Sequence, residues 1–249
     1  MKNYYYTIAY PFLLLIKHYI NFERPVPNPW EIIYVNPSKI NHLTVPRFRE
    51  KPKNGTYVVG GDWDMENRDL ELMLTSNHHH SGEIKFRCSV PFENYGMYQS
   101  CKEHFDADVQ WEKTQFYKWL ELHPSARIQN TKNQRIENVN VIFDNIRSNG
   151  FKSQNEIKSP DQNILAEIKS ELRPADEVQV NISREGDLIM DDGRHRLISA
   201  KILNLDEIPV RVRVRHKEWQ ETRERIAEGE VPDYVDFSHP DIKTFASRK

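Results

Sequence analysis

The hexapeptide Asp191–Arg196 (DDGRHR) brings together residue types that can hold a phosphate group. Residues Asp187–Met190 before it predict a strand, and the spacing of apolar residues from about Arg196 to Leu203 predicts a helix. The free backbone N–H groups and the dipole at a helix N-terminus favour anions. Gly193 lets the backbone come close to a ligand because it has no side chain. The sequence therefore predicts a phosphate-binding turn between a strand and a helix.

Two arginines and a histidine within this turn add hydrogen-bond donors. Arg194 and Arg196 can each hold phosphate oxygens through two N–H groups, and His195 can supply a third contact or a proton. Asp192 can orient an acceptor hydroxyl, take its proton or hold Mg²⁺. Two alternatives stay open from the residues alone. The arginines can pair with Asp191, Asp192 or Glu207, and Asp192 can cap the helix.

A second candidate site follows the flexible pair Gly60-Gly61, where Asp62 and Asp64 stand two residues apart. Their carboxylate oxygens suit Mg²⁺, and the alternative is a turn in which these aspartates bond their own backbone. The triplet His78–His80 is a weaker metal candidate, because adjacent histidines on an extended chain alternate sides. Its polar neighbours predict an exposed loop.

A row of cationic residues alternates with valines near the end of the predicted domain and comprises Arg211, Arg213, Arg215 and His216. The alternation predicts a strand with one buried face and one cationic face. Such a face can meet the phosphates of a nucleotide, with Arg215 and His216 extending the site, or those of a nucleic acid. The alternative is that these side chains pair with acidic neighbours such as Glu218 and Glu221.

Hydrophobic spacing predicts the elements that must position these residues. Strands are expected at Trp30–Val35, Val178–Ile182, Asp187–Met190 and Val210–Val214, and helices at Leu70–Leu74, Gln115–Leu122, 136–150, Leu165–Leu172, about Arg196–Leu203 and after Trp219. Turn signals close the first strand at Asn36–Lys39 and form a hairpin at Arg184–Asp187. The fold class predicted from this mixture is α+β, a small mixed sheet with packed helices.

Three segments are expected along the chain. Residues 1–24 form an apolar N-terminal segment, which we expect to be helical and packed on the domain or on a partner; a peripheral membrane contact is the alternative. Residues 25–216 form the main domain, with an insertion of uncertain structure at about 41–135. Residues 217–249 form a charged helix and a loosely held tail.

The composition limits the function classes. Of 249 residues, 38% are hydrophobic and 29% charged, and the net charge of −2 gives no overall basic field to attract nucleic acid. The apolar run Ile8–Ile16 is too short to span a bilayer and is followed by no typical cleavage site. The two cysteines, Cys88 and Cys101, are interpreted as reduced thiols of a cytoplasmic protein.

The order of these elements resembles the ParB/sulfiredoxin-like superfamily. The residues that carry the resemblance are the strand and turn at Trp30–Ile40, the helix ending Asn145-Ile146-Arg147-Ser148-Asn149-Gly150, the turn Asp191–Arg196 and the strand Ile208-Pro209-Val210-Arg211-Val212. They cover about residues 30–40 and 136–215, under half of the chain. The resemblance implies a ParB/sulfiredoxin-like fold that binds a nucleotide (ATP, ADP or CTP) at Gly193–Arg196.

Members of this superfamily bind CTP, transfer phosphate from ATP or ADP to a small acceptor, or reduce oxidised cysteine with ATP; some are described as nucleases. The partition proteins carry Gly-Glu-Arg-Arg at the turn, and the sulfiredoxins carry a cysteine beside their His-Arg pair. The free serine kinases use an Asp-Gly-x-His-Arg turn, which the present turn resembles most. A kinase of this fold needs a general base, and Glu31 on the first strand is the candidate.

The functional expectation is a nucleotide-binding and phosphate-binding protein, a phosphotransferase acting on a small hydroxylated acceptor with Mg²⁺ held by Asp62 or Asp64. One alternative is a DNA-binding or nuclease-type module that uses Arg211, Arg213 and Arg215. Another is a non-catalytic scaffold. The identity of the nucleotide, the identity of the acceptor and the oligomeric state do not follow from the residues.

Overall fold

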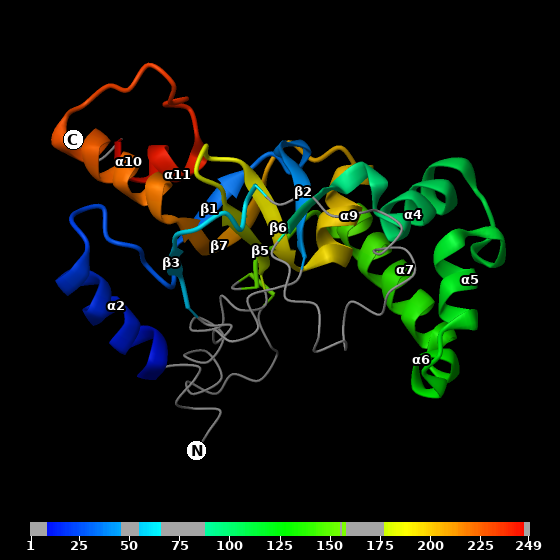
Figure 1. Cartoon of the computed structure of the whole chain (residues 1–249). Helices are drawn as coiled ribbons and strands as arrows, with labels where there is room; N and C mark the ends of the chain where they lie inside the picture. Colours follow the sequence, from blue (N-terminus) through cyan, green and yellow to red (C-terminus); the bar gives the residue numbers. More distant parts are fainter. Residues whose placement is uncertain (1–8, 46–54, 66–87, 155, 158–176, 247–249) are drawn as a thin grey trace.

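The structure, a computed structural model, describes residues 9–45, 55–65, 88–154, 156–157 and 177–246 of the chain. It is an α+β protein built on one mixed sheet, as the sequence predicts (Figure 1). The strands are β1 (Ile32–Val35), β2 (Ile40–Val45), β3 (Tyr57–Val59), β4 (Cys88–Pro91), β5 (Val178–Ile182), β6 (Leu188–Asp192) and β7 (Ile208–His216). The helices are α2 (Tyr10–Asn21), α4 (Gly96–Ala107), α5 (Gln115–Leu122), α6 (Ala126–Asn130), α7 (Lys132–Asn149), α9 (Arg194–Ile202), α10 (Lys217–Glu228) and α11 (Pro240–Ala246).

The sheet runs in the order β1-β7-β5-β6-β2-β4, and β3 pairs with the far half of β7. β5 and β6 form an antiparallel hairpin, whose turn includes Gly186 with a positive φ of 94°. The chain then returns through α9 to β7, which lies parallel to β5. The predicted unit of hairpin, turn, helix and strand is therefore confirmed, and it forms the centre of the sheet.

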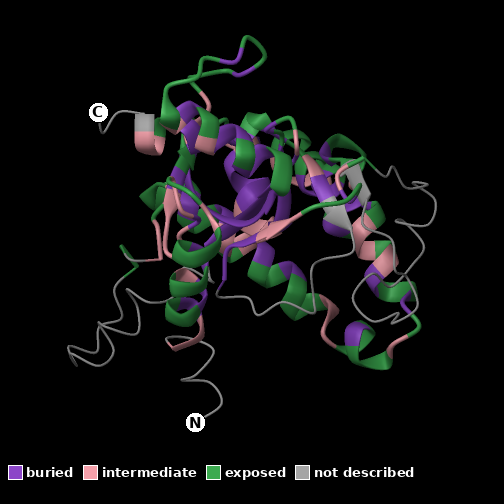
Figure 2. Ribbon diagram, turned by 60° about the vertical axis from the view of Figure 1, so that its left-hand side comes forward, coloured by how far each residue is buried: buried purple, intermediate pink, exposed green. Residues whose placement is uncertain are grey.

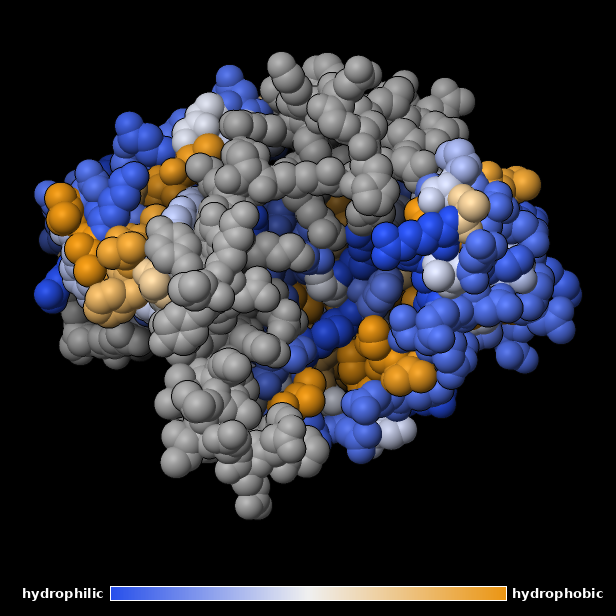
Figure 3. Space-filling model, turned by 90° about the horizontal axis from the view of Figure 1, so that it is seen from below, coloured by the Kyte–Doolittle hydropathy of each residue, from blue (hydrophilic) through white to orange (hydrophobic). Residues whose placement is uncertain are grey.

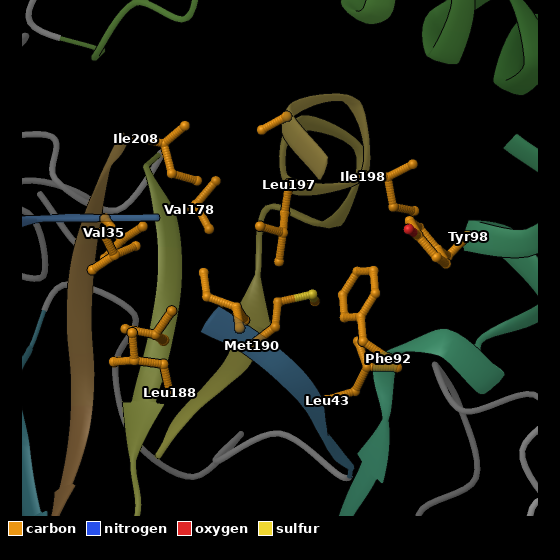
Figure 4. Packing of buried hydrophobic residues seen from close by; sticks show 14 of the residues in the cluster. Val35, Leu43, Phe92, Tyr98, Val178, Leu188, Met190, Leu197, Ile198 and Ile208 are labelled. Atoms are coloured by element: carbon orange, nitrogen blue, oxygen red, sulfur yellow. The ribbon is translucent and has the colours of Figure 1, made fainter. Parts of the chain in front are cut away.

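The main hydrophobic core lies between the sheet and the helices α4, α5, α7 and α9 (Figure 4). Leu197 and Ile198 of α9 point down onto Met190 of β6, Val178 of β5 and Phe92. Figure 2 shows buried residues concentrated in the sheet and on the inner sides of the helices. Burial of this apolar area fixes α9, and with it the turn before the helix, against the sheet.

An irregular pairing in the middle of β7 divides its arginines between the two faces of the sheet. Val212 lies opposite Val180, but Val214 lies opposite Asn181, so Arg213 is an extra residue in the ladder. A residue inserted in this way reverses the alternation of the side chains beyond it. The prediction of a single cationic face along Arg211, Arg213 and Arg215 is therefore wrong: Arg211 and Arg215 point to opposite faces.

The predicted insertion at about 41–135 belongs to the domain itself. β2 and β4 extend the sheet beyond β6, and β3 adds to its other side. The helices α4, α5 and α6 pack beside α7, whose first residues also lie in this stretch. The predicted helix Gln115–Leu122 is confirmed as α5. The proposed helices Leu70–Leu74 and Leu165–Leu172 and the triplet His78–His80 lie outside the described residues.

The C-terminal residues are held more firmly than the sequence suggests. α10 contacts β7 and β3, and α11 contacts β1 and α10. Ile242 and Asp241 of α11 are fully buried. The predicted charged helix is confirmed as α10, whereas the expectation of a loosely held tail is wrong for α11.

The N-terminal segment contains a helix, as predicted for residues 1–24. α2 packs through Leu14 against a second, smaller cluster that includes Trp63, Ile189 and Val214, on the sheet face opposite the main core. None of the helices in the described ranges combines the length and hydrophobicity that a membrane crossing requires.

Candidate functional site

The turn between β6 and α9 depends on a glycine. Gly193 has φ +83°, and a Cβ atom on this residue would lie 2.8 Å from the Cα of Val178. Any other residue would therefore be strained by its backbone angle and would also collide with β5. α9 begins directly after this glycine, at Arg194, two residues earlier than predicted. The N–H of Gly193 donates to Oδ1 of Asp192 at 2.9 Å, which fixes the approach to the helix.

Arg194 is the first residue of α9, and its Nη1 donates to the hydroxyl oxygen of Tyr95 at 2.8 Å. Tyr95 precedes α4, so this bond links the turn to a helix almost a hundred residues earlier in the chain. Because the hydroxyl is neutral, this bond orients the guanidinium group, and the carboxylate of Asp192 also lies within range of its charge.

His195 lies beside two arginines. Burial, followed by the positive charges of Arg194 and of Arg135 on α7, lowers the pKa of His195 to about 4. The imidazole is therefore neutral at pH 7. Within the described part of the chain, its ring nitrogens make no hydrogen bond, and Arg135 bonds only the Thr131 hydroxyl through its Nε at 3.1 Å. The charges of Arg194 and Arg135 thus act on this ring more strongly than the charge of Asp192, which opposes them.

Arg196, the third cation of the predicted turn, has a structural role. Its Nη1 lies 3.1 Å from Glu177 Oε2, its Nη2 donates to the carbonyl of Lys152, and its guanidinium group stacks over Phe151. These contacts join the end of α7 to the start of β5. Arg196 thus has a carboxylate partner, as in the alternative to phosphate binding, but the partner is Glu177 and not Asp191, Asp192 or Glu207.

A row of polar side chains crosses the sheet from the turn. Gln179 of β5 lies opposite Asp192 of β6 and opposite Arg211 of β7. Paired residues on neighbouring strands point to one face, so these three side chains lie in a line. Beside them Arg213 pairs with Asp191 at 3.2 Å, and the Asn181 amide donates to Asp191 at 3.3 Å.

This buried polar face was not predicted, and it changes the interpretation of the arginines in β7. Arg211 and Arg213 are 0% and 3% exposed. A charge buried in this way cannot present itself to a nucleic acid duplex, so the prediction of a DNA-binding arginine stripe is not supported.

Glu31 and Arg215 belong to a different cluster. Arg215 is fully buried, and it lies 2.6 Å from Asp241 Oδ1 and 3.1 Å from Glu31 Oε2. Asp241 also pairs with Arg223 at 3.2 Å and accepts from the Trp219 indole at 2.9 Å. Burial alone would raise the pKa of Asp241, but the charges of Arg215 and Arg223 hold it well below its usual range.

This cluster is separated from the turn. β1, which Glu31 precedes, is three strand positions from β6, or about 14 Å at the usual strand spacing. Arg215 and His216 are five or more residues along β7 from the level of the turn, about 16 Å or more. Glu31 is thus not placed as a general base for the turn, and Arg215 and His216 do not extend an anion site there. His216 caps α10 and bonds the Gly61 carbonyl at 2.7 Å.

The predicted magnesium ligands lie in a third place. Both carboxylate oxygens of Asp64 accept from Arg184, and Asp62 accepts from the same guanidinium group at 2.9 Å. Burial raises the pKa of Asp64, but the bonds from Arg184 outweigh burial and leave it below its usual value. The guanidinium group of Arg184 thus lies where the sequence predicted a Mg²⁺ ion. Across the described residues, no three His, Cys, Asp or Glu side chains are grouped to hold a metal ion.

Two contributors to the candidate site were absent from the sequence prediction. Arg135 and Tyr95 stand 60 and 99 positions before the residues they influence, and neither lies in a recognisable motif. Asp241 had a usable signal, since Pro240-Asp241 has the proline and acidic residue typical of a first helical turn.

Comparison with protein-family models, with curated proteins and with solved structures gave no match to this chain.

Proposed function

We propose that the chain binds the phosphate groups of a nucleotide at the N-terminus of α9. The observation that carries this proposal is the convergence of a helix N-terminus, the guanidinium groups of Arg194 and Arg135, and the neutral imidazole of His195. A phosphate there would accept hydrogen bonds from the helix N–H groups and from the arginines. Gly193 would let these oxygens approach the backbone.

The finer fold assignment is part of the proposal. The hairpin, glycine turn, helix and parallel strand resemble the core unit of the ParB/sulfiredoxin-like superfamily, and the Asp-Gly-Arg-His-Arg turn resembles that of its free serine kinases. On this resemblance we propose a phosphotransferase that acts on a small hydroxylated acceptor. The sheet order supports a compact α+β core of this kind.

The transfer step would use the two remaining candidates at the turn. The oxygen of the acceptor hydroxyl attacks the terminal phosphorus of the nucleotide, and the bond from that phosphorus to its bridging oxygen breaks. The hydroxyl proton passes to Asp192 or to the neutral ring of His195, and the nucleoside diphosphate leaves. Catalysis would rest mainly on positioning and on neutralising the charge of the phosphoryl group. Mg²⁺ would enter with the nucleotide, because Asp62 and Asp64 are bonded to Arg184.

Calorimetry with ATP, ADP, CTP and adenosine, each with and without Mg²⁺, tests the binding. Arg135→Ala should weaken binding of the nucleotide about tenfold, because it removes one charge-assisted contact. Arg147→Ala is the matched control: Arg147 also lies on α7 but pairs with Asp144. Adenosine should bind no better to the wild type than to R135A. Equal nucleotide affinities for R135A and R147A would refute the assignment.

The transfer activity has its own test. Incubation of the protein with Mg²⁺-ATP and free serine, followed by ³¹P NMR, should give a phosphorylated acceptor and ADP. His195→Gln and Asp192→Asn should each reduce the rate, while R147A should match the wild type. If nucleotide binds but neither serine nor a panel of small alcohols is phosphorylated, the binding proposal stands and the transferase proposal fails.

A further inference from the structure

One face of α2 exposes a stripe of apolar side chains. The helix is buried at Pro11, Leu14 and His18. Its outer side carries large hydrophobic residues spaced one, three or four positions apart: Phe12, Leu13, Ile16, Tyr19 and Ile20, which are 44–78% exposed. On the left of Figure 3, hydrophobic side chains gather over this helix. A contiguous apolar stripe of this kind marks an interaction surface rather than a scattered set of surface residues.

Acidic side chains border the stripe where α2 ends. Glu23 stands three residues after Ile20, and its carboxyl shares a hydrogen bond with Glu228 on α10. Glu224 lies one turn earlier on α10, within range of the charge of Glu23. This contact is fixed, because the Gln220 side chain of α10 holds the carbonyl of Pro25 at 2.9 Å.

When they are ionised, these carboxylates repel one another. The hydrogen bond and the charge of Glu23 raise the pKa of Glu228, and burial together with Glu23 and Glu221 raises that of Glu224. Positive charges brought next to them would relieve this repulsion. A membrane surface of anionic lipids would instead increase the electrostatic repulsion at these carboxylates.

We propose that the outer face of α2 and the carboxylates of Glu23, Glu224 and Glu228 form a docking surface for a basic amphipathic helix of a partner protein. The apolar side of the partner helix packs along Phe12, Ile16 and Ile20, and its lysines or arginines meet the carboxylates at the end of the stripe. One amphipathic helix would thus pack on the exposed face of another, with charge setting the orientation. The surface lies on the α2 side of the fold and is independent of the turn before α9.

A designed peptide provides the test. An 18-residue helical peptide of leucine and lysine, with its leucines on one face, is labelled and titrated with the full chain by fluorescence anisotropy. Ile16→Gln with Ile20→Gln should weaken binding at least tenfold, and Glu23→Gln with Glu228→Gln about three- to tenfold. A peptide with glutamate in place of every lysine should not bind measurably.

Matched variants distinguish binding at this surface from non-specific binding of the peptide. Leu122→Gln with Val141→Gln removes two exposed apolar residues elsewhere, and Glu103→Gln with Glu137→Gln removes two exposed carboxylates elsewhere. Both pairs should bind the lysine peptide like the wild type. The proposal is overturned if the lysine peptide does not bind, or if the control pairs lose as much affinity as the α2 pairs. It is also overturned if vesicles with anionic lipids occupy the stripe instead, or if sedimentation shows a dimer that Ile16→Gln with Ile20→Gln dissociates.

Discussion

The two arginine clusters, one around Arg215 and one at the first turn of α9, differ in the partners of their guanidinium groups. Arg215 and Arg223 are buried against the carboxylate of Asp241, with Glu31 nearby, so the fold itself satisfies their charge. At the first turn of α9, Arg194 bonds the Tyr95 hydroxyl and lies within range of the charge of Asp192, and Arg135 bonds the hydroxyl of Thr131. The clusters thus differ in exposure: Arg215 and Arg223 are buried in ion pairs, whereas Arg135 lies at the surface. The first cluster holds α11 in place, and the second is where we place the phosphate.

The largest effect is expected where the first cluster loses its anion. Asp241→Asn leaves two buried guanidinium groups without their main carboxylate, which should lower the free energy of unfolding by about 3–5 kcal/mol. Urea unfolding followed by tryptophan fluorescence measures it, with the exposed Asp236→Asn as control. A loss below about 1 kcal/mol would mean that Asp241 does not hold this cluster together.

Substitution of two glycines tests the close packing of the turn between β6 and α9. Gly193→Ala should destabilise the protein by more than the roughly 1–2 kcal/mol that a left-handed backbone costs, because its Cβ also meets the Val178 backbone. Gly229→Ala, with φ +106° and no atom within 4 Å of the added Cβ, should cost only the backbone part. Nucleotide affinity should fall in the first variant alone. Equal costs for the two variants would contradict a close approach at Gly193.

A smaller effect concerns pH. His195 has a pKa of about 4 in the folded chain and about 6.5 when unfolded. Above pH 6.5 both states carry a neutral ring and the residue contributes no pH dependence. As the pH falls from 6.5 to 4, the unfolded chain binds the proton more readily, so stability is lost. Unfolding curves at several pH values should show this loss in the wild type and a smaller one in His195→Gln. Identical slopes for both would contradict a lowered pKa.

The sequence predicts local features of the fold and of the site better than distant ones. Alternating valines and the Arg184–Asp187 turn define β5, β6 and β7 because each signal lies within one element. The turn at Gly193 was recognised for the same reason. The neutralisation of Arg215 could not be foreseen, because Asp241 lies 26 residues further on.

Contacts with residues far away in the sequence changed the set of candidate site residues that the sequence predicts. Asp64 is bonded by Arg184, 120 residues away, and that contact replaces the expected metal. The bulge at Arg213 depends on the register with β5, which a single strand does not reveal. Arg135 joins His195 only because α7 packs on α9. The residue types indicate which ligands the chain could bind, and the long-range packing determines at which positions those residues come together.

The most direct test of the account follows the His195 imidazole by NMR, assigned by its absence in His195→Gln, with and without inorganic pyrophosphate. An anion bound among Arg194, Arg135 and the α9 N-terminus must favour the protonated ring, so the pKa of His195 should rise from about 4 when pyrophosphate is added. The rise should be weaker in R135A and unchanged in R147A. A titration midpoint that stays the same at saturating pyrophosphate would contradict phosphate binding at this turn.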